Sequence, residues 1–450
     1  MPTVAFITFG CKVNQYDAEA LREAALALGY EEAPPAERAD VYVVTTCTVT
    51  AEGFAKSRRA VLRAARRSPG SKILVVGCST EEDRRSLGPL PQIALAGGNE
   101  AKALVPGFLS GEWAPGRPAP EARELWTRGI ERFHGRTRAC VKVQDGCDRF
   151  CSFCIVPLVR GRSRSRPPGD VVEEARRLAG NGYREIVVSG VRIQDYGKDL
   201  GMTSGLASLL LRIAEVPGIL RIRLSSLGPT GFDERLLDAF ENPVFCPHWH
   251  IPLQSGSDAV LARMRRDYRA ADFLSLVEAL RARFEDPSVS TDIVVGLPGE
   301  TEADFEETLR VSRMAGFSKI HVFPYSRREG TLASRFGGEV PRSEIRRRAR
   351  AARRLESELA LAYKARFVGK EVRVLVEGRA RSPGPDSPAH VARVLEGFTE
   401  RYVRVAFEEP EPGALGRLRG TLQRVFVLGA EPSRAWGAPA GCAAALPAES

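Results

Sequence analysis

The first hundred residues alternate between short apolar runs and longer segments with a helical apolar stripe. One such segment, Asp17–Leu28, repeats apolar residues at helical spacing and stops at Gly29. Runs that are apolar throughout are typical of strands buried on both faces of a parallel sheet, with the helices as crossovers. We therefore expect strands at Val4–Phe9, Val41–Val44 and Ile73–Val76, and helices at Asp17–Leu28 and Ala51–Arg67.

From about residue 136 onwards, the pattern becomes a strand followed by a helix, repeated. Six segments have the length and composition of strands, which favours a partial barrel of parallel strands with outer helices, a (β/α)6 architecture. Sites in such barrels lie at the carboxyl ends of the strands. The strands are expected at Ala139–Val143, Glu185–Val188, Arg221–Leu224, His248–Ile251, Asp292–Val295 and Lys319–Phe323.

Beyond the barrel, an arginine-rich helix from about Ser343 to Phe367 leads into short segments that alternate apolar and basic residues. The helix is either a solvated face or a surface that contacts phosphates. Short strands separated by turns suggest a small β-barrel with arginines on its outer face, and such barrels often bind RNA. Its strands are expected at Glu371–Val376, His390–Val394, Tyr402–Val405 and Leu422–Val427.

These patterns predict an α/β protein built from three domains. The boundaries fall where periodicity is interrupted by proline, glycine and polar residues. We expect an N-terminal parallel-sheet domain at 1–112, a linker at 113–135 with a short helix around 122–130, the barrel at 136–367, the small β-barrel at 368–430, and a disordered, Ala- and Pro-rich tail at 431–450.

Net charge and cysteine content limit which kinds of partner and site the protein is expected to have. The formal net charge of the 450-residue chain is +10, which favours a polyanionic partner. The sequence has no apolar run of about eighteen residues, and its N-terminus leads directly into a strand, so we expect a cytoplasmic protein without a membrane partner. In that compartment, the nine cysteines are more readily explained as metal ligands than as disulfides.

Cys147, Cys151 and Cys154 stand on a glycine-led loop after an expected strand. Structural zinc and most iron–sulfur clusters have four protein ligands, so three thiolates leave a coordination position open for another molecule. The alternative is a zinc knuckle or chance spacing. No fourth cysteine or histidine follows at finger spacing, which disfavours the zinc knuckle.

Three further cysteines, Cys11, Cys47 and Cys78, each follow the carboxyl end of one expected N-terminal strand. Parallel strands bring these ends to the same edge of a sheet. Any one of the three could be an ordinary small buried residue. Three equivalent positions instead indicate that these thiols hold an iron–sulfur cluster, separate from any metal site on the Cys147–Cys154 loop and again with an open coordination position. The remaining cysteines stand where no motif requires them and are interpreted as incidental: Cys140, Cys246 and Cys442.

The Cys147–Cys154 loop, with Phe153 before its last cysteine, resembles that of the radical S-adenosylmethionine (SAM) enzymes. Residues 1–430 resemble the radical SAM methylthiotransferases in domain order and in both cysteine triads, the C-terminal barrel being a TRAM domain in that family. Within the family, the chain is most similar to the branch that methylthiolates N6-threonylcarbamoyladenosine at position 37 of tRNA. The matching segments are Thr8–Tyr16, Gln144–Cys147, Arg160–Arg166, Leu253–Ser257 and Val322–Arg327.

The resemblance implies two 4Fe–4S clusters, an auxiliary one on Cys11, Cys47 and Cys78 and one on the Cys147–Cys154 loop. SAM cleaved at the loop cluster gives a 5′-deoxyadenosyl radical that takes hydrogen from C2 of adenine, and the auxiliary cluster delivers a sulfur methylated by a second SAM. No side chain is assigned a catalytic role. By analogy, SAM is held by Phe153, Ser189, Gly190, Gln254 and Val295, and RNA phosphates by Arg160, Arg162, Arg164 and Arg166.

The resemblance also implies several partners: the anticodon loop of tRNA, a sulfur donor, and an electron donor such as flavodoxin or ferredoxin. The threonylcarbamoyl group carries a carboxylate, so we expect an arginine near the pocket, at a position that the sequence does not identify. Arg192 stands where this branch usually has histidine, which leaves its role open. Two alternatives remain: a sister branch that acts on isopentenyladenosine 37 or on a ribosomal-protein aspartate, and a non-catalytic iron–sulfur RNA-binding protein.

Overall fold

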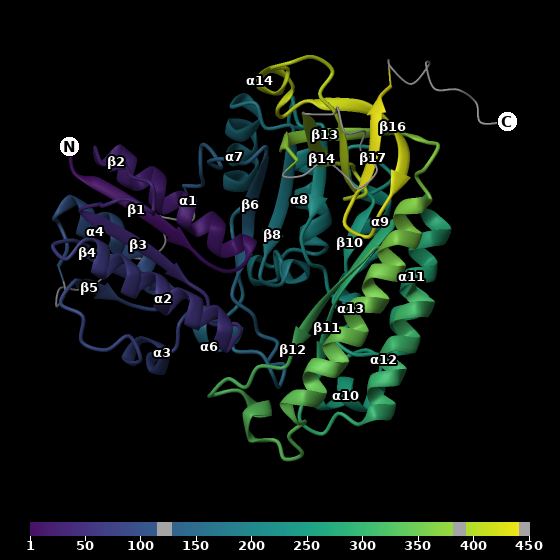
Figure 1. Ribbon diagram of the computed structural model, residues 1–450, viewed down its shortest axis with the longest axis horizontal. Coiled ribbons are helices and arrows are strands. Elements are labelled where there is room, and N and C mark those ends of the chain that lie inside the picture. Colours follow the sequence, from purple (N-terminus) through teal and green to yellow (C-terminus); the bar gives the residue numbers. More distant parts are fainter. Residues whose placement is uncertain (115–127, 381–392, 441–450) are drawn as a thin grey trace.

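The N-terminal part of the chain folds into a parallel sheet in the strand order β2-β1-β3-β4-β5 (Figure 1). The structure is a computed structural model that describes residues 1–114, 128–380 and 393–440. The strands are Thr3–Thr8 (β1), Glu31–Glu32 (β2), Val41–Thr46 (β3), Lys72–Gly77 (β4) and Ile93–Ala96 (β5). The helices are Lys12–Ala27 (α1), Ala51–Arg67 (α2), Glu81–Arg85 (α3), the 3-10 turn Glu100–Ala103 (η1) and Leu104–Ser110 (α4).

Two apolar clusters cover the two faces of this sheet, which is why its central strands are apolar throughout. Val43 and Leu74 face the cluster that includes α1 and α4 residues, whereas Tyr42 and Ile73 face the cluster that includes α2 residues. The three predicted strands are confirmed, and the structure adds β2 and β5 at the edges. Helix α1 begins at Lys12, five residues earlier than expected.

The central part is the predicted partial barrel of six parallel strands, present as two sheets in the orders β7-β6-β8-β9 and β10-β11-β12. An isolated parallel bridge between Ser226 and His250 links them. The strands are Arg138–Asp145 (β6), Glu185–Gly190 (β8), Arg221–Leu224 (β9), His248–His250 (β10), Ser288–Val295 (β11) and Lys319–Pro324 (β12), with the short antiparallel Arg164–Ser165 (β7) at the edge.

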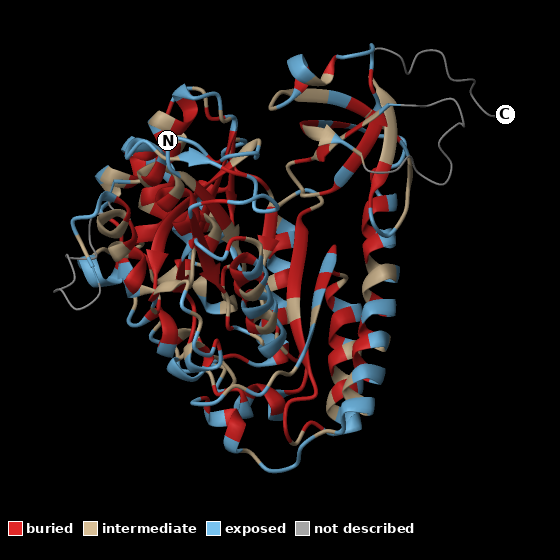
Figure 2. Cartoon of the chain, turned by 60° about the vertical axis from the view of Figure 1, so that its left-hand side comes forward, coloured by how far each residue is buried: buried red, intermediate tan, exposed pale blue. Residues whose placement is uncertain are grey.

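Helices cover the outer side of these strands, and the largest apolar cluster lies between the two layers (Figures 1 and 2). They are Pro168–Gly180 (α7), Gly205–Ala214 (α8), Glu234–Ala239 (α9), Asp258–Arg263 (α10), Ala270–Arg283 (α11), Glu302–Ala315 (α12) and Arg342–Ala365 (α13). The short helix Val156–Arg160 (α6) instead follows the loop of Cys154, and its Val159 packs with Cys78 of the N-terminal part. Short 3-10 turns lie at Ile193–Asp195, Lys198–Leu200, Pro229–Gly231 and Leu332–Arg335. The short helix expected around 122–130 lies mostly outside the described residues.

The C-terminal part is a closed barrel in the strand order β13-β14-β15-β17-β16. Its strands are Glu371–Arg379 (β13), Val394–Phe398 (β14), Arg404–Glu408 (β15), Leu422–Ala430 (β16) and Ala435–Pro439 (β17), with the helical turn Leu415–Leu418 (α14). Val374, Val405 and Val425 fill its core, and Arg373, Arg404 and Arg424 are exposed, as the alternation predicted.

The prediction that the chain is disordered from residue 431 onwards is wrong for the first part of that segment. This part forms β17, which pairs with both β15 and β16 and closes the barrel. Main-chain hydrogen bonds stabilise this strand although its composition resembles that of a linker. Residues 441–450 lie outside the described part, as do residues 390–392 of the strand expected at His390–Val394. Within the described residues, no helix combines the length and the apolarity needed to cross a membrane.

Candidate functional site

The three N-terminal cysteines lie on three loops at the carboxyl edge of the first sheet. Cys11 precedes α1, Cys47 follows β3 and Cys78 follows β4. All three line one cavity. Burial raises the pKa of the Cys47 thiol, and the neighbouring Cys78 and Cys11 raise it further. The structure therefore brings together the three thiols that the strand pattern predicted at this edge.

Two glycines and an asparagine allow these loops to approach one another. Gly10 and Gly77 have φ of +95° and +113°, and a Cβ on Gly10 would lie 2.9 Å from Cβ of Cys47. The buried Asn14 side chain donates hydrogen bonds to the main-chain oxygens of Phe9 (2.5 Å) and Thr46 (3.1 Å). A side chain at position 10 would push the first loop away from Cys47.

The other triad, Cys147, Cys151 and Cys154, lies on the loop after β6. Gly146 opens this loop with φ of +72°, and a Cβ there would lie 1.8 Å from the main-chain oxygen of Arg162, so no larger residue fits. Burial raises the pKa of Cys147 and raises that of Cys154 to about 12. Such thiols ionise when a metal displaces their protons, so burial couples metal binding to the closed fold of this loop.

The spacing of both triads differs from that of a single-ion site. Among the described residues, one group of three possible metal ligands has its atoms within 4.8 Å of one another, and that group contains no cysteine. Thiolates bound to different irons of a cluster stand farther apart than the ligands of one ion. The cysteine triads therefore fit clusters better than they fit zinc.

A cavity of about 960 Å³ lies between the first triad and the inner face of the barrel strands. This is at the upper end of the range for ligand pockets. Ser189 and Gly190, at the carboxyl end of β8, line it. Cys140 also lines the cavity. Burial raises the pKa of Cys140 and that of Cys246 to about 12, which agrees with an inert, incidental role for both thiols. Cys442 lies outside the described residues.

The other three residues predicted to hold SAM lie outside the lining of this cavity. Phe153 packs against an apolar cluster that includes Met264 and Val294. Gln254 has φ of +67°, and its main chain is hydrogen-bonded to residues of β11. The Val295 side chain is fully buried in the main core, and its main-chain oxygen accepts a hydrogen bond from the N–H of Tyr325 at 2.8 Å.

The four arginines predicted to contact RNA separate into two buried and two exposed side chains. Arg160 and Arg166 are 4% and 0% exposed and contact buried acidic partners, so the prediction that they hold phosphates is wrong. Arg162 and Arg164 keep 79% and 48% of their side chains exposed, with Asp148 and Asp145 as neighbours. Arg162 remains available to RNA, and the contact of Arg164 with RNA stays a prediction.

Arg160 instead lies between the two cysteine triads. Its Nε donates to Sγ of Cys78 at 3.1 Å, and its Nη1 donates to Asp145 Oδ1 at 2.8 Å. The same Asp145 oxygen accepts from the main-chain N–H of Gly146 at 2.8 Å, one residue before Cys147. A single buried guanidinium thus connects a thiol of the first triad to the loop that carries the second.

A second arginine donates to the loop triad. Nη1 of Arg266 lies 3.4 Å from Sγ of Cys151, and the main-chain N–H of Arg149 donates to Sγ of Cys147, also at 3.4 Å. Hydrogen bonds to the sulfur atoms of an iron–sulfur cluster are one of the means by which a protein sets the reduction potential of that cluster. Arg192, where the branch usually has histidine, pairs locally with Asp195 at 2.6 Å.

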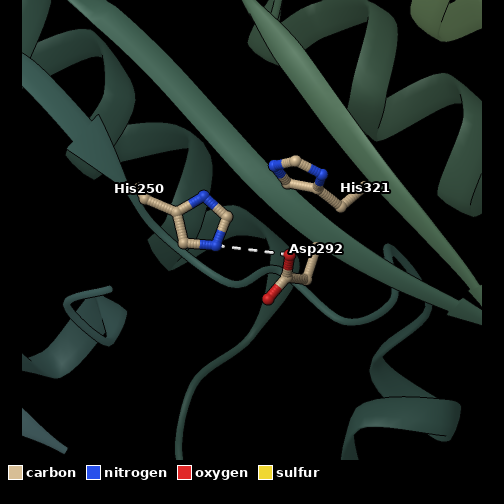
Figure 3. Close-up of side chains that lie close together, drawn as sticks. All are labelled: His250, Asp292 and His321. Atoms are coloured by element: carbon tan, nitrogen blue, oxygen red, sulfur yellow. Dashed lines mark ion pairs between the residues drawn. The ribbon is translucent and has the colours of Figure 1, made fainter. Parts of the chain in front are cut away.

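Sequence reasoning missed a polar cluster on the inner face of strands β10, β11 and β12. His250, Asp292 and His321 are the group within 4.8 Å of one another, and all three line the cavity (Figure 3). His250 Nε2 lies 3.3 Å from Asp292 Oδ1, and its Nδ1 lies 3.0 Å from Ser290 Oγ. The two imidazoles meet edge to face, with centroids 5.6 Å apart. This arrangement suits hydrogen bonding to a bound molecule better than convergence on one cation.

Comparisons with known proteins agree with this geometry. The sequence model of the Radical SAM superfamily matches residues 141–311, and that of the Uncharacterized protein family UPF0004 matches residues 3–96. The Threonylcarbamoyladenosine tRNA methylthiotransferase MtaB of Thermotoga maritima is 39% identical over 416 residues, which cover 90% of this chain and 92% of that protein. The chain belongs to the radical SAM methylthiotransferase family.

Family members named for either of two tRNA substrates are similar to this methylthiotransferase. MtaB of Bacillus subtilis is 34% identical, covering 91% of each chain, and the tRNA-2-methylthio-N(6)-dimethylallyladenosine synthase of Frankia alni is 38% identical, covering 83% of this chain and 77% of that protein. Among solved structures, the radical SAM methyltransferase TsrM of Kitasatospora setae shares the fold, with a TM-score of 0.51 at 15% identity over 72% of this chain and 73% of that chain. Family membership supplies two 4Fe–4S clusters and SAM as cofactors.

Proposed function

We propose that this methylthiotransferase converts N6-threonylcarbamoyladenosine at position 37 of tRNA to its 2-methylthio derivative. The observation that carries the proposal is the pair of cysteine triads connected by Arg160, the first of which lines one large cavity. Two triads with open coordination positions account for a reaction that needs both a radical and a sulfur. Its substrate is inferred from relatives whose names specify threonylcarbamoyladenosine and which match about 90% of the chain.

In this proposal Cys11, Cys47 and Cys78 hold the auxiliary cluster, and Cys147, Cys151 and Cys154 hold the cluster that binds SAM. When bound, these groups supply the electron, the radical chemistry and the sulfur. Ser189 and Gly190 line the cavity at the end of β8, in a position to contact SAM. Contacts to SAM from Phe153, Gln254 and Val295, which do not line this cavity, remain predictions.

The protein's own part is to bind, orient and enclose the base. RNA readers prefer bases in loops, and placing an adenine between two clusters requires extruding it from its stack at a cost of a few kcal/mol. Polar groups on the inner strand faces, including Ser225 and His250, offer hydrogen bonds to the extruded nucleoside. The C-terminal barrel, with exposed Arg373 and Arg424, is suited to hold the RNA backbone.

The remaining partners follow from this chemistry. Reductive cleavage of SAM needs an electron donor such as flavodoxin or ferredoxin, and each methylthio group consumes sulfur that a sulfur donor must replace. Both partners, and location in the cytoplasm where tRNA is modified, are part of the proposal.

The test of the proposed function is nucleoside mass spectrometry on tRNA from cells that lack the protein. We expect 2-methylthio-N6-threonylcarbamoyladenosine to disappear, its unthiolated precursor to accumulate, and the product to return with the wild type but not with Cys47→Ala. An unchanged level of that nucleoside would overturn the substrate assignment. Loss of the isopentenyl counterpart instead would place the protein in the sister branch.

Arg162→Ala should weaken tRNA binding several-fold and reduce the slope of log affinity against log salt by about 1. The reason is that Arg162 is the most exposed arginine of its run, and we expect it to contact one phosphate. Filter binding across a salt series measures both quantities. Arg176→Ala is the matched control, since Arg176 is exposed on α7 and pairs with Glu173. If Arg162→Ala and the control behave alike, Arg162 does not contact RNA.

A further inference from the structure

Nine lysine and arginine side chains line the cavity, and seven of them already have partners within the described structure. Six of these contact carboxylates, and Lys364 donates to two main-chain oxygens. The carboxylate pairs are Arg138 with Glu377, Arg160 with Asp145, Arg223 with Glu185, Lys319 with Glu356, Arg401 with Glu400 and Arg404 with Glu396. Lys12 and Arg136 are the two whose side chains have no ion pair or hydrogen bond to any described residue.

The two cations differ in where they lie relative to the cysteine loops. Arg136 precedes β6, at the amino end of the barrel strands and away from the cysteine loops. Lys12 follows Cys11 directly and is the first residue of α1. Its charge acts inside the cavity: burial lowers the pKa of His248 and His321, and Lys12 lowers both further. Among the described residues, Lys12 is therefore the one cavity-lining cation that has no ion pair or hydrogen bond and stands next to a cysteine of either triad.

We propose that Lys12 binds the carboxylate of the threonylcarbamoyl group on the substrate base. This inference rests on the proposed function and names the residue that reads the substituent, a role that the sequence had led us to expect of an arginine. Enclosing a carboxylate without a partner is costly, and an ammonium group that no protein acid occupies provides that partner. Asp292 and the two imidazoles beside it offer hydrogen bonds to the hydroxyl and ureido groups of the same substituent.

A divalent cation on His250, Asp292 and His321 is a weaker alternative. The imidazoles pack edge to face, and the positive charge of Lys12 acts on His321, which opposes a second cation there. SAM is the other possible source of a carboxylate in this cavity. The experiment must therefore change the charge of the nucleoside and leave SAM unchanged.

The experiment compares two anticodon stem-loops that carry N6-threonylcarbamoyladenosine at position 37, one with the free carboxylate and one with its methyl ester. For the wild-type holoenzyme we expect the ester to lower kcat/KM and affinity by about 10- to 100-fold, the range that one charge-assisted hydrogen bond supplies. Lys12→Met should process both RNAs at similar, low efficiency, and Lys12→Arg should recover part of the preference for the acid. Affinities measured without reductant report binding independently of turnover.

Lys56→Gln is the matched control, because Lys56 is an exposed lysine on α2 outside the cavity and pairs with Glu52. It should keep the wild-type ratio of acid to ester. Iron content and SAM cleavage in the absence of RNA check that the Lys12 variants retain both clusters. Lys12→Arg covers the case in which Lys12→Met fails to assemble them.

The inference fails if Lys12→Met and Lys12→Arg both keep the wild-type preference for the acid, or if the wild type treats acid and ester alike. A raised KM for SAM in Lys12→Met with an unchanged acid-to-ester ratio also overturns it, in favour of SAM as the ligand. If the wild type does not methylthiolate the acid stem-loop at all, the proposed function itself falls, and the assignment of Lys12 with it.

Discussion

Arg160→Met should lower the midpoint potential of the auxiliary cluster and destabilise the protein at the same time. The guanidinium donates a hydrogen bond to Sγ of Cys78 at 3.1 Å from a position that is 4% exposed. A positive donor next to a cluster sulfur favours the reduced, more negative state, so its removal shifts the potential downwards. Redox titration followed by EPR measures this shift.

The matched control is Arg266→Met, because Arg266 donates to Cys151 of the other triad at 3.4 Å. It should shift the cluster that binds SAM and leave the auxiliary cluster unchanged, whereas Arg160→Met should do the reverse. This pair of variants assigns each potential to its triad. If neither variant moves either potential, hydrogen bonds to sulfur do not tune the clusters in this protein.

The stability cost of Arg160→Met follows from the acids that it leaves behind. Asp145 and Asp17 are buried, and Arg160 contacts both, at 2.8 and 3.5 Å. Because Lys142 still contacts both carboxylates in the variant, we expect the free energy of unfolding to fall by about 3 kcal/mol, in the lower part of the range for breaking a buried ion pair. Thermal unfolding of the iron-loaded proteins measures the loss.

The same variant should also change how the stability of the protein depends on pH on the acid side. Burial raises the pKa of Asp17 and Asp145, but Lys142, Arg160 and other nearby cations lower it more, and the net pKa of both lies below the usual value. Carboxylates of this kind stabilise the fold above their ordinary pKa, and that stability is lost as pH falls through the depressed value. Removing Arg160 raises both pKa values, so unfolding in acid should begin at a higher pH.

The positions of all six triad cysteines in the fold were predictable because each depends on local patterns. Apolar runs place Cys11, Cys47 and Cys78 at strand ends, and parallel strands bring those ends to one edge whatever the loops contain. The glycine-led loop places the other three after β6 in the same way. The start of α1 was not predictable, because its N-cap is Cys11, a residue with no capping preference, and its first turn is polar.

The roles of Arg160 and Arg166 could not be read from the sequence. A run of arginines is typical of a solvated or phosphate-binding surface, and the residues that contact these two come from other elements: Asp17 and Tyr16 from α1, and Glu174, eight residues away, from α7. Asp17 and Glu174 contact them only because α1 and α7 pack against the same strand. Long-range pairing of charges leaves no periodic signal.

The polar lining of the barrel was hidden for a related reason. The alternation in His248–His250 shows which side chains share a face, but inward polar residues look the same in sequence as outward ones. Lys12 has the same ambiguity, since an exposed lysine at a helix start is ordinary. The fold turns these faces towards a cavity, and that step needs the three-dimensional arrangement of the two sheets.

Glu174→Ala should separate the N-terminal sheet from the barrel more effectively than any surface change. The Glu174 carboxylate is fully buried and accepts hydrogen bonds from Tyr16 Oη (2.8 Å) and the main-chain N–H of Ile130 (2.9 Å), and it pairs with Arg166. It therefore joins α1, the segment before β6 and the arginine run. Breaking such a buried pair costs about 3–5 kcal/mol.

Two controls separate the charge from the hydrogen bonds around it. Tyr16→Phe removes the hydrogen bond that the hydroxyl donates to Glu174 and the one that it accepts from Arg166, and should cost about 2 kcal/mol. Glu173→Ala, next in sequence but exposed and paired with Arg176, should leave the melting temperature nearly unchanged. Calorimetry of the iron-loaded proteins measures the melting temperatures of Glu174→Ala and of the two control variants. Since Tyr16 lies on α1, which begins directly after Cys11, loosening this contact should also lower methylthiolation more than it lowers SAM cleavage on the loop cluster. A Glu174→Ala protein that melts like Glu173→Ala would show that the buried acid does not hold the two parts together.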